Sequence, residues 1–325
     1  MKKFVVRRYT FADFDIWNAF VAESKNATFI FHRNFMEYHA DRFEDFSILV
    51  FKDDQLIAAL PANKVDNTVF SHQGLTYGGL ILKNDIKLVD VIIIFKNVLQ
   101  FLDQVGIKKC TLKLIPFFYC DSFSDELEYA LFAANARLIQ IDSLATVDLQ
   151  KTFFISKTRT ESIRRGKKNN LIIKEESSFD LFWNEILIPN LQLKHQVKPV
   201  HTLAEITYLK SNFPENIRQF NVYDGANIVA GTTVFVTKNV VHPQYVSGNN
   251  YKNKLGSLDY LYHHLIKNVF AEKAFFDFGI SNENQGKNIN EGLLFWKESF
   301  GAQTVVQRFY EIQTSNFELL ENVLL

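Results

Sequence analysis

The alternation of apolar and polar residues changes along the chain between a two-residue period, typical of strands, and a helical period near 3.6. In the first half, the two-residue period predicts strands over 3–10, 46–53, 55–65, 67–74, 107–115 and 137–149. The helical period predicts helices over 11–24, 34–43, 86–106 and 124–136. Local chemistry marks several boundaries: Asp53-Asp54 as a tight turn, Gly106 as a helix end, and Ser124 as a helix start.

The second half repeats this order of elements. Strands are expected over 171–177, 217–224, 227–237, 240–248, 274–281 and 302–313, and helices over 178–195, 202–213, 257–273 and 290–301. Asp224-Gly225 predicts a hairpin, Thr202 with Glu205 predicts a capping box, and Pro189 interrupts the first helix. Both halves therefore follow the order β-α-α-β-β-β-α-β-α-β. This predicts an α/β (α+β) protein with two domains, 1–150 and 151–325.

Composition narrows the class of protein. The 325 residues hold 36 Lys and Arg against 36 Asp and Glu, so no overall field favours DNA or an anionic membrane. The most apolar run, 88–102, contains Asp90 and Lys96 and is too short to span a bilayer. The N-terminus has no apolar signal segment, so we expect a cytoplasmic protein. Cys110 and Cys120 form no CxxC or Cys/His cluster, so no metal is expected.

The segment FFDFGISNENQGKNINEGLLFWKESFGAQ, residues 275–303, is similar to a stretch of the Fem-type peptidyltransferases. These and related bacterial GNAT enzymes have a strand with Asp-Phe-Gly, a polar loop, and a helix that carries Lys and ends in Phe-Gly. LGSLDYLYHHLI and TESIRRGKKNNLIIKEES resemble two of their helices, the second one basic. The resemblance implies two tandem GNAT-like (acyl-CoA N-acyltransferase) domains, each a mixed central sheet flanked by helices. It also implies acyl transfer to an amine or hydroxyl.

The resemblance leaves the acyl donor open between acetyl-CoA or another acyl-CoA and an aminoacyl-tRNA. GNAT acetyltransferases hold the coenzyme A pyrophosphate with a Gln/Arg-x-x-Gly-x-Gly/Ala loop. The matching stretch here, 253–258, keeps only the middle glycine, and its candidate donor-binding residues are Lys254, Gly256 and Ser257. The implied acceptor is a small-molecule or nucleotide-linked amine, such as a nucleotide sugar or a peptidoglycan precursor. The alternative is a non-catalytic GNAT-fold protein that binds a ligand or partner.

Asp277-Phe278-Gly279 is not a kinase magnesium motif, because the chain lacks a kinase glycine-rich loop and His-Arg-Asp. Asp277 either has a catalytic role or accepts hydrogen bonds from a neighbouring loop. The loop 281–290 follows a strand end, where α/β proteins place ligands, or is a plain solvated connection. Here Glu283 is the candidate general base. Candidate substrate-binding residues are Ser281, Asn284, Asn290 and, on the next helix, Lys297, which would balance substrate charge or be merely exposed.

The strand VVHPQYVSG carries a second group of candidates. Alternation puts His242 and Gln244 on one face and Tyr245 on the other. Pro243 cannot donate to a ladder and predicts a bulge or an edge. His242 is a candidate base or substrate ligand, Tyr245 a candidate proton donor to a leaving group, and Gln244 a candidate substrate ligand, although a lone strand histidine is commonly structural.

Two further stretches stand out. The glycine-rich run 71–80 is either a plain turn or a lining of the cleft between the domains, through Ser71, His72, Gln73 and Tyr77. The run 151–170 has seven basic residues and one acidic residue, a local charge of +6. It is either a solvated face or a phosphate-binding helix for a nucleotide-linked sugar or a tRNA acceptor end, with Arg164 and Arg165 as the candidates.

Overall fold

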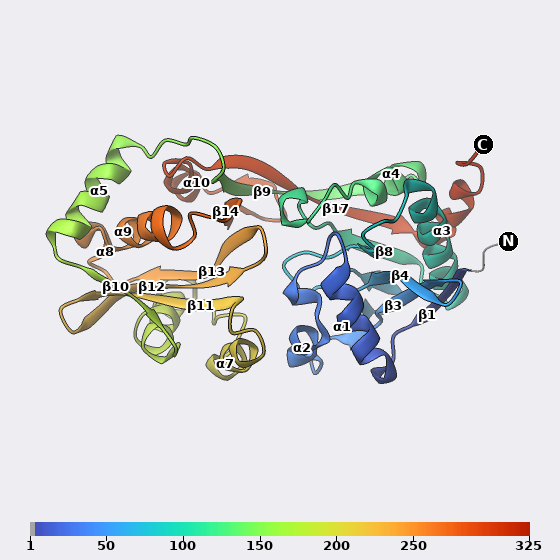
Figure 1. The fold of residues 1–325 in the computed structure, drawn as a ribbon, viewed down its shortest axis with the longest axis horizontal. Helices are drawn as coiled ribbons and strands as arrows, with labels where there is room; N and C mark the ends of the chain where they lie inside the picture. The colour runs from blue at the N-terminus through green and yellow to red at the C-terminus, as the bar shows by residue number, and fades with distance from the viewer. Residues whose placement is uncertain (1–3) are drawn as a thin grey trace. The chain divides into compact units, whose positions relative to one another are not determined.

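The computed structural model of the chain describes residues 4–325, which form two compact units (Figure 1). Unit 1 comprises the residues up to Asp142 together with Val306–Leu325, and unit 2 comprises Ser143–Val305. The C-terminal segment thus belongs with unit 1. The predicted division into 1–150 and 151–325 places this segment in the second domain and so differs from the two units. None of the described helices is long and apolar enough to span a bilayer.

Unit 1 contains two sets of paired strands. One is an antiparallel sheet in the order β1-β3-β4-β7, made of Phe4–Arg8, Ile48–Lys52, Gln55–Leu60 and Ile81–Leu82. The other follows the order β17-β8-β6-β5-β2, made of Gln303–Gln313, Lys109–Lys113, Thr68–Phe70, Asn63–Val65 and Glu44–Asp45. In this second set β6 and β8 are parallel and the other pairs antiparallel. The pairing is therefore mixed, as predicted.

Helices cover these strands and close the core of unit 1. They are α1, α2, α3 and α4, which span Phe14–Glu23, Arg33–Met36, Leu88–Gln104 and Glu126–Ala133. The apolar face of α3 is buried, and its side chains pack with residues of β3, β4 and β8 in one hydrophobic cluster. Ile312 of β17 and Leu320 of the 3₁₀ turn Thr314–Leu320 are buried in the same cluster. The C-terminal segment is thus part of this core.

Unit 2 is built on strands in the order β10-β11-β12-β13-β14-β9. Their bounds are Ile172–Glu176, Ile217–Asp224, Asn227–Val236, Val240–Gly248, Phe275–Ile280 and Arg137–Asp148. All neighbours are antiparallel except β13 and β14, which are parallel. The helices are α5, α6, α7, α8, α9 and α10, spanning Lys157–Lys168, Ile188–His195, Leu203–Asn212, Lys252–Leu255, Ser257–His264 and Glu291–Glu298. π-helical turns precede α6 and follow α9, at Phe182–Leu187 and Leu265–Val269.

Most local signals in the sequence are confirmed. Asp53 and Asp54 form a two-residue hairpin turn with positive φ, and Thr202 and Glu205 form a capping box. Gly106 follows α3 with a φ of +85°. The helix expected to begin at Ser124 instead has Asp125 as its N-cap residue.

Three expected elements differ from the structure. The strand predicted over 55–65 breaks at Pro61 into β4 and β5, which belong to different sheets, because proline cannot donate a ladder hydrogen bond. The helix expected over 34–43 is only α2 and one 3₁₀ turn, Glu37–His39. The polar loop 281–290 contains a small hairpin of β15 and β16, Asn282–Glu283 and Asn288–Ile289.

Candidate active site

The strands β13 and β14 separate shortly after they meet. Their parallel pairing consists of Val240 with Phe275 and Val241 with Phe276, and it continues no further along either strand. On its other side β13 pairs with β12, with a register shift that leaves Gln244 as an extra residue next to Pro243. The bulge predicted from Pro243 is thus confirmed. The remainder of β13 has an open edge toward β14, and such edges present backbone N–H and C=O groups to a ligand.

Asp277-Phe278-Gly279 forms an irregularity on β14 at the point of separation. The pairing of β14 with β9 shifts register between Asp277 and Ile280, and Gly279 has a φ of +73°. A Cβ on Gly279 would lie 2.9 Å from Cε1 of His242, so only glycine fits this backbone beside the imidazole. Asp277 is 2% exposed, and its Oδ1 accepts the N–H of Gly279 at 2.8 Å and the hydroxyl of Thr146 at 3.4 Å.

The imidazole of His242 is oriented by the same irregularity. Its Nδ1 lies 3.0 Å from the carbonyl oxygen of Asp277 and 3.4 Å from Oδ2 of the same residue. Because a carbonyl oxygen only accepts hydrogen bonds, Nδ1 carries the proton and donates it. In the neutral ring this leaves Nε2 unprotonated, which is the state required of a general base.

Lys297 of α10 lies against the same strand. Its ammonium group donates hydrogen bonds to the carbonyl oxygens of Gly279, at 3.0 Å, and Ile280, at 2.5 Å, and the residue is 4% exposed. Burial lowers the pKa of Lys297 to about 8, although the Asp277 carboxylate acts in the opposite direction. Asp277, His242 and Lys297, with Gly279 between them, form one group that we call the β14 cluster. Lys297 is therefore buried rather than exposed.

The polar loop after β14 holds its candidates differently. Ser281 is 2% exposed, whereas Glu283 and Asn284 lie on the exposed hairpin. Asn290 is the N-cap of α10, and its amide donates to Oε1 of Glu283 at 3.2 Å. No hydrogen bond or ion pair recorded among the described residues joins Glu283 to His242 or Lys297. The role of Glu283 as general base stays a prediction.

A cavity of about 390 Å³ opens beside the far part of β13. Its lining comes from β13, α5, α6, α8, α9 and α10, and consists of Arg159, Asn190, Leu191, Val246, Ser247, Lys252, Asn253, Leu258, Asp259, Gly292, Leu293 and Trp296. One wall is a buried ion pair: Asp259 accepts from Nη1 of Arg159 at 2.8 and 2.9 Å and from the indole of Trp296 at 2.8 Å. Val246 of the lining is four residues beyond His242 on β13, about 13 Å along an extended strand, whereas Trp296 directly precedes Lys297 of the β14 cluster.

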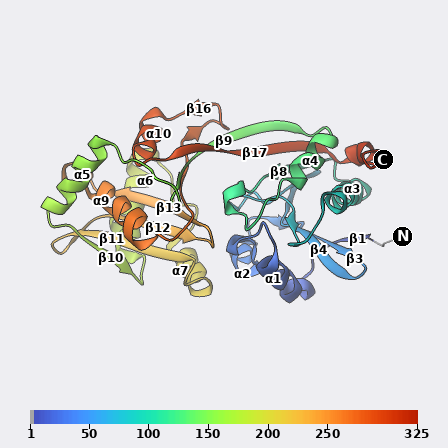
Figure 2. The same ribbon diagram turned by 45° about the horizontal axis from the view of Figure 1, so that its top comes forward.

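Helix α5 covers the N-terminal end of α9. In both views α5 lies beside α9, and Figure 1 also shows α8 next to it (Figures 1 and 2). Gly256, with a φ of +72°, separates α8 from α9, and a Cβ there would lie 2.2 Å from the carbonyl oxygen of Ser162. A Cβ on Gly166 would lie 2.5 Å from Cβ of Tyr260. The backbone of α5 therefore packs directly against Gly256 at the start of α9, while Lys252, Asn253, Leu258 and Asp259 of the same segment line the cavity.

No protein-family model and no curated protein matches the chain. Solved structures do. FemX is 10% identical over 98% of this chain and 99% of its own, with a TM-score of 0.65. L-PGS from Bacillus licheniformis is 12% identical over 97% and 96%, with a TM-score of 0.60. A tandem GNAT protein from the clavulanic acid biosynthesis pathway is 10% identical over 97% and 99%, with a TM-score of 0.51.

The chain has a tandem GNAT fold. The fold class predicted from the doubled order of elements is thereby confirmed. Within this fold the other candidate residues of unit 2 differ in their exposure to solvent. Lys254 is exposed on α8, Ser257 is fully buried, and Arg164 and Arg165 are exposed on α5.

Tyr245 lies in the interior of unit 2. It is 8% exposed, its hydroxyl accepts the backbone N–H of His201 at 3.1 Å, and it shares a 2.6 Å hydrogen bond with Nδ1 of the same histidine. Burial raises the pKa of Tyr245 to about 12, against smaller effects that include a hydrogen bond from Gln244. Strand alternation placed Gln244 and Tyr245 on opposite faces of β13. The bulge at Gln244 breaks this alternation, so the Gln244 side chain can bond to Tyr245.

Tyr245→Phe is expected to lower the free energy of unfolding by about 1–2 kcal/mol, because His201 loses its buried partner. Urea unfolding of the variant measures this loss of stability. The rate of acyl transfer per folded molecule measures any effect on catalysis. A transfer rate unchanged to within about threefold would argue against the predicted role as proton donor. A loss of about a hundredfold would support that role.

In unit 1, the candidate residues of the glycine-rich run form hydrogen bonds and ring contacts with other residues of the same unit. The hydroxyl of Ser71 accepts from the N–H of Lys113 at 2.8 Å, and a Cβ on Gly78 would lie 1.9 Å from the carbonyl oxygen of Ser71. The ring of His72 stacks on His39 with centroids 4.9 Å apart, and burial lowers the pKa of His72 to about 3. The Tyr77 hydroxyl lies 2.8 Å from that of Thr28, and Gln73 pairs with Asn63. Contact of these candidates with a substrate stays a prediction.

Sequence reasoning missed the Arg159–Asp259–Trp296 wall. Asp259 is an acidic residue on a helix whose neighbours are largely apolar, and an acid buried on such a helix needs a cationic partner. That partner lies a hundred residues earlier, within the basic run. The acid was a usable signal, but its partner follows only from the packing of α5 on α9.

Proposed function

We propose that the chain is an acyltransferase that moves an aminoacyl group from an RNA-linked donor to an amine. The acceptor is a small-molecule or nucleotide-linked amine, such as a nucleotide sugar or a cell-envelope precursor. The observation that carries the proposal is the β14 cluster at the separation of β13 and β14, where an oriented imidazole and a buried ammonium group meet one open strand edge.

The β14 cluster has the groups that aminolysis of an ester requires. The acceptor nitrogen attacks the carbonyl carbon, forming a C–N bond, and Nε2 of His242 takes a proton from the nitrogen. The C–O bond of the ester then breaks, and the leaving hydroxyl oxygen takes a proton from Lys297. A lysine with a pKa near 8 can both donate this proton and recover it near neutral pH. The positive charge of Lys297 also stabilises the developing oxyanion.

The charge on α5 supports an RNA-linked donor. Its outward side carries Lys157, Arg164, Arg165, Lys167 and Lys168, all exposed. Such a cationic helix face binds phosphodiesters without reading sequence. The cavity beside β13 would then hold the donor terminus, with the acyl group reaching toward the β14 cluster.

The function is tested with two donors in separate reactions: tRNA charged with a radiolabelled amino acid, and radiolabelled acetyl-CoA. Each donor is incubated with the chain and a panel of amine acceptors that includes nucleotide sugars. We expect label to move from tRNA into an alkali-stable amide, and not from acetyl-CoA. Transfer from acetyl-CoA alone would contradict the donor assignment. Binding of charged tRNA without any transfer or deacylation would favour the non-catalytic alternative.

The basic face of α5 gives a separate prediction. The double variant Lys167→Gln/Lys168→Gln is expected to weaken tRNA binding about tenfold, because two phosphate contacts are lost. The slope of log K against log salt concentration should become less steep by about 1–2. Filter binding at several salt concentrations measures both. The matched control is Lys87→Gln/Lys108→Gln, which removes two exposed lysines of unit 1. Equal weakening in both double variants would show a diffuse charge effect and count against α5 as the binding face.

A further inference from the structure

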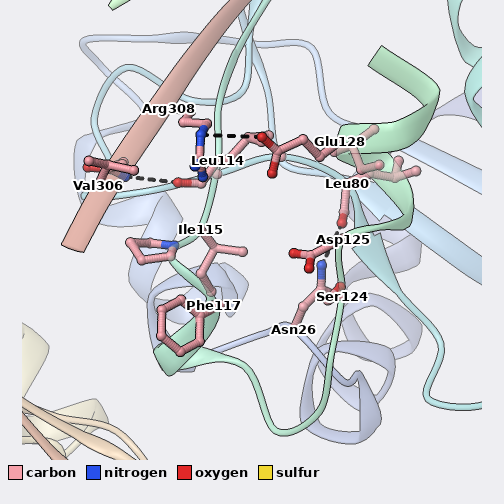
Figure 3. Close-up of a pocket in the computed structure, with 15 residues that line it drawn as sticks. Asn26, Leu80, Leu114, Ile115, Phe117, Ser124, Asp125, Glu128, Val306 and Arg308 are labelled. Carbon is pink, nitrogen blue, oxygen red and sulfur yellow. Dashed lines mark hydrogen bonds and ion pairs between the residues drawn. The ribbon is translucent and has the colours of Figure 1, made fainter. Parts of the chain in front are cut away.

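Unit 1 contains a second cavity, of about 270 Å³, that none of the sequence-predicted candidates lines. It lies between the end of β8, the start of α4 and the middle of β17 (Figure 3). Its lining consists of Asn26, Gly78, Gly79, Leu80, Leu114, Ile115, Pro116, Phe117, Ser124, Asp125, Leu127, Glu128, Val306, Gln307 and Arg308. It therefore combines an apolar floor with a few acidic and hydroxyl groups.

Two polar groups beside α4 are available to a ligand. Asp125 is the N-cap residue of α4, yet its carboxylate makes no capping hydrogen bond, and Figure 3 shows it directed into the cavity. The hydroxyl of Ser124 is enclosed, and no hydrogen-bond partner for it occurs among residues 4–325. An enclosed hydroxyl without a partner is costly unless a ligand or water completes its bonding.

Glu128 supplies a third acceptor. Its Oε1 forms an ion pair with Nε of Arg308 at 3.3 Å and accepts a hydrogen bond from the hydroxyl of Tyr310 at 3.0 Å. No such contact is recorded for Oε2 within the described part of the chain. The Arg308 guanidinium thus neutralises Glu128 and leaves Asp125 as the uncompensated charge of the wall.

The sign of the field decides the class of ligand. Asp125 and Glu128 contribute two negative charges against one positive charge of Arg308 and about +0.5 from the start of α4. The remaining charge is negative, so the cavity favours a cation. Glu126, on the same first turn, is already paired with the buried Lys25.

We propose that this cavity binds an organic cation, a primary ammonium group on a short aliphatic stem. An ammonium group has three N–H donors, which match the acceptors of Asp125, Ser124 and Glu128. The side chains of Ile115 and Phe117 would cover the stem, and Phe117 is 58% exposed. The volume lies just below the usual range for small-molecule sites, so the ligand is small.

The test uses the full chain with cadaverine as the cationic probe and 1-pentanol as its neutral counterpart. Titrations are followed by protein NMR, because chemical-shift changes of residues in α4 and β8 show where the probe binds. Asp125→Asn is expected to weaken cadaverine binding about five- to tenfold, and Ser124→Ala about threefold. Glu272→Gln, an exposed acid of unit 2, is the matched control and should change nothing. Sodium chloride should weaken the wild-type interaction.

Several outcomes would overturn the proposal. They are absence of cadaverine binding at about 10 mM, equal binding of 1-pentanol, or full binding by Asp125→Asn. So would binding of inorganic pyrophosphate at the same peaks, lost in Arg308→Gln, since it would identify an anion site. Asp125 is exposed, so its variant should fold, and equal melting temperatures establish this before titration. None of these measurements depends on acyl transfer.

Discussion

Lys297→Met is expected to lower acyl transfer by about a hundredfold or more, because methionine keeps the aliphatic stem but removes the ammonium group of the β14 cluster. The matched control is Lys273→Met. Lys273 also donates to two backbone carbonyls, those of Thr237 and Lys238, at 2.7 and 3.1 Å, but it lies outside the cluster. Single-turnover transfer from charged tRNA is the measurement. Equal activity in the two variants would remove Lys297 from the mechanism.

The same variant has a signature in stability that does not require activity. The pKa of Lys297 is about 8 in the folded chain and 10.5 as the reference for the unfolded chain. Between these values the unfolded chain holds a proton that the folded chain has released, so stability increases with pH across this window. Below pH 8 this contribution is absent. The increase amounts to at most about 3 kcal/mol.

Urea unfolding at pH 7, 8, 9 and 10 measures this contribution as a difference between the wild type and Lys297→Met. The difference should be constant up to pH 8 and then move in favour of the wild type as the pH rises. A difference that stays flat to pH 10 would show that Lys297 keeps its proton in the folded chain, and the proton-donor role would lose its support.

Gly256→Ala is expected to destabilise unit 2 by about 3 kcal/mol or more. Two costs combine: alanine at a φ of +72° costs about 1 kcal/mol, and its Cβ would lie 2.2 Å from a backbone carbonyl of α5. Gly225→Ala is the matched control, since Gly225 has a φ of +59° with nothing within 4 Å of a Cβ. We expect it to cost about 1 kcal/mol.

Urea unfolding with a probe in unit 2, such as Trp296 fluorescence, separates the two effects. Similar losses for the two glycine variants would mean that α5 yields easily at its contact with the start of α9. A large loss for Gly256→Ala alone, together with weaker tRNA binding, would support α5 as a fixed part of the donor site.

Local chemistry could be predicted from the sequence, and contacts between distant segments could not. The turn at Asp53-Asp54, the capping box at Thr202 and the bulge beside Pro243 each depend on residues close together in the chain, and all three occur. His242 and Lys297 were also candidates from their positions alone. Their joint attachment to one strand was not predictable, because it depends on where α10 packs against β14.

Partners of buried polar residues show the same limit. Tyr245 looked available for chemistry, but His201 occupies its hydroxyl from a segment 44 residues earlier. Ser124 looked like a helix cap, yet Asp125 takes that position and the Ser124 hydroxyl is left enclosed. A residue type indicates which bonds a side chain can make. The tertiary fold decides which of them are already made.

The return of residues 306–325 to unit 1 has a consequence for synthesis of the chain. Ile312 and Leu320 are buried in the core of unit 1, so that core lacks part of its packing until residues 306–325 leave the ribosome. Unit 2 is encoded entirely before them and has its whole sequence earlier. Of the two units, unit 1 is therefore the one that can complete its core only after the whole of unit 2 has been synthesised.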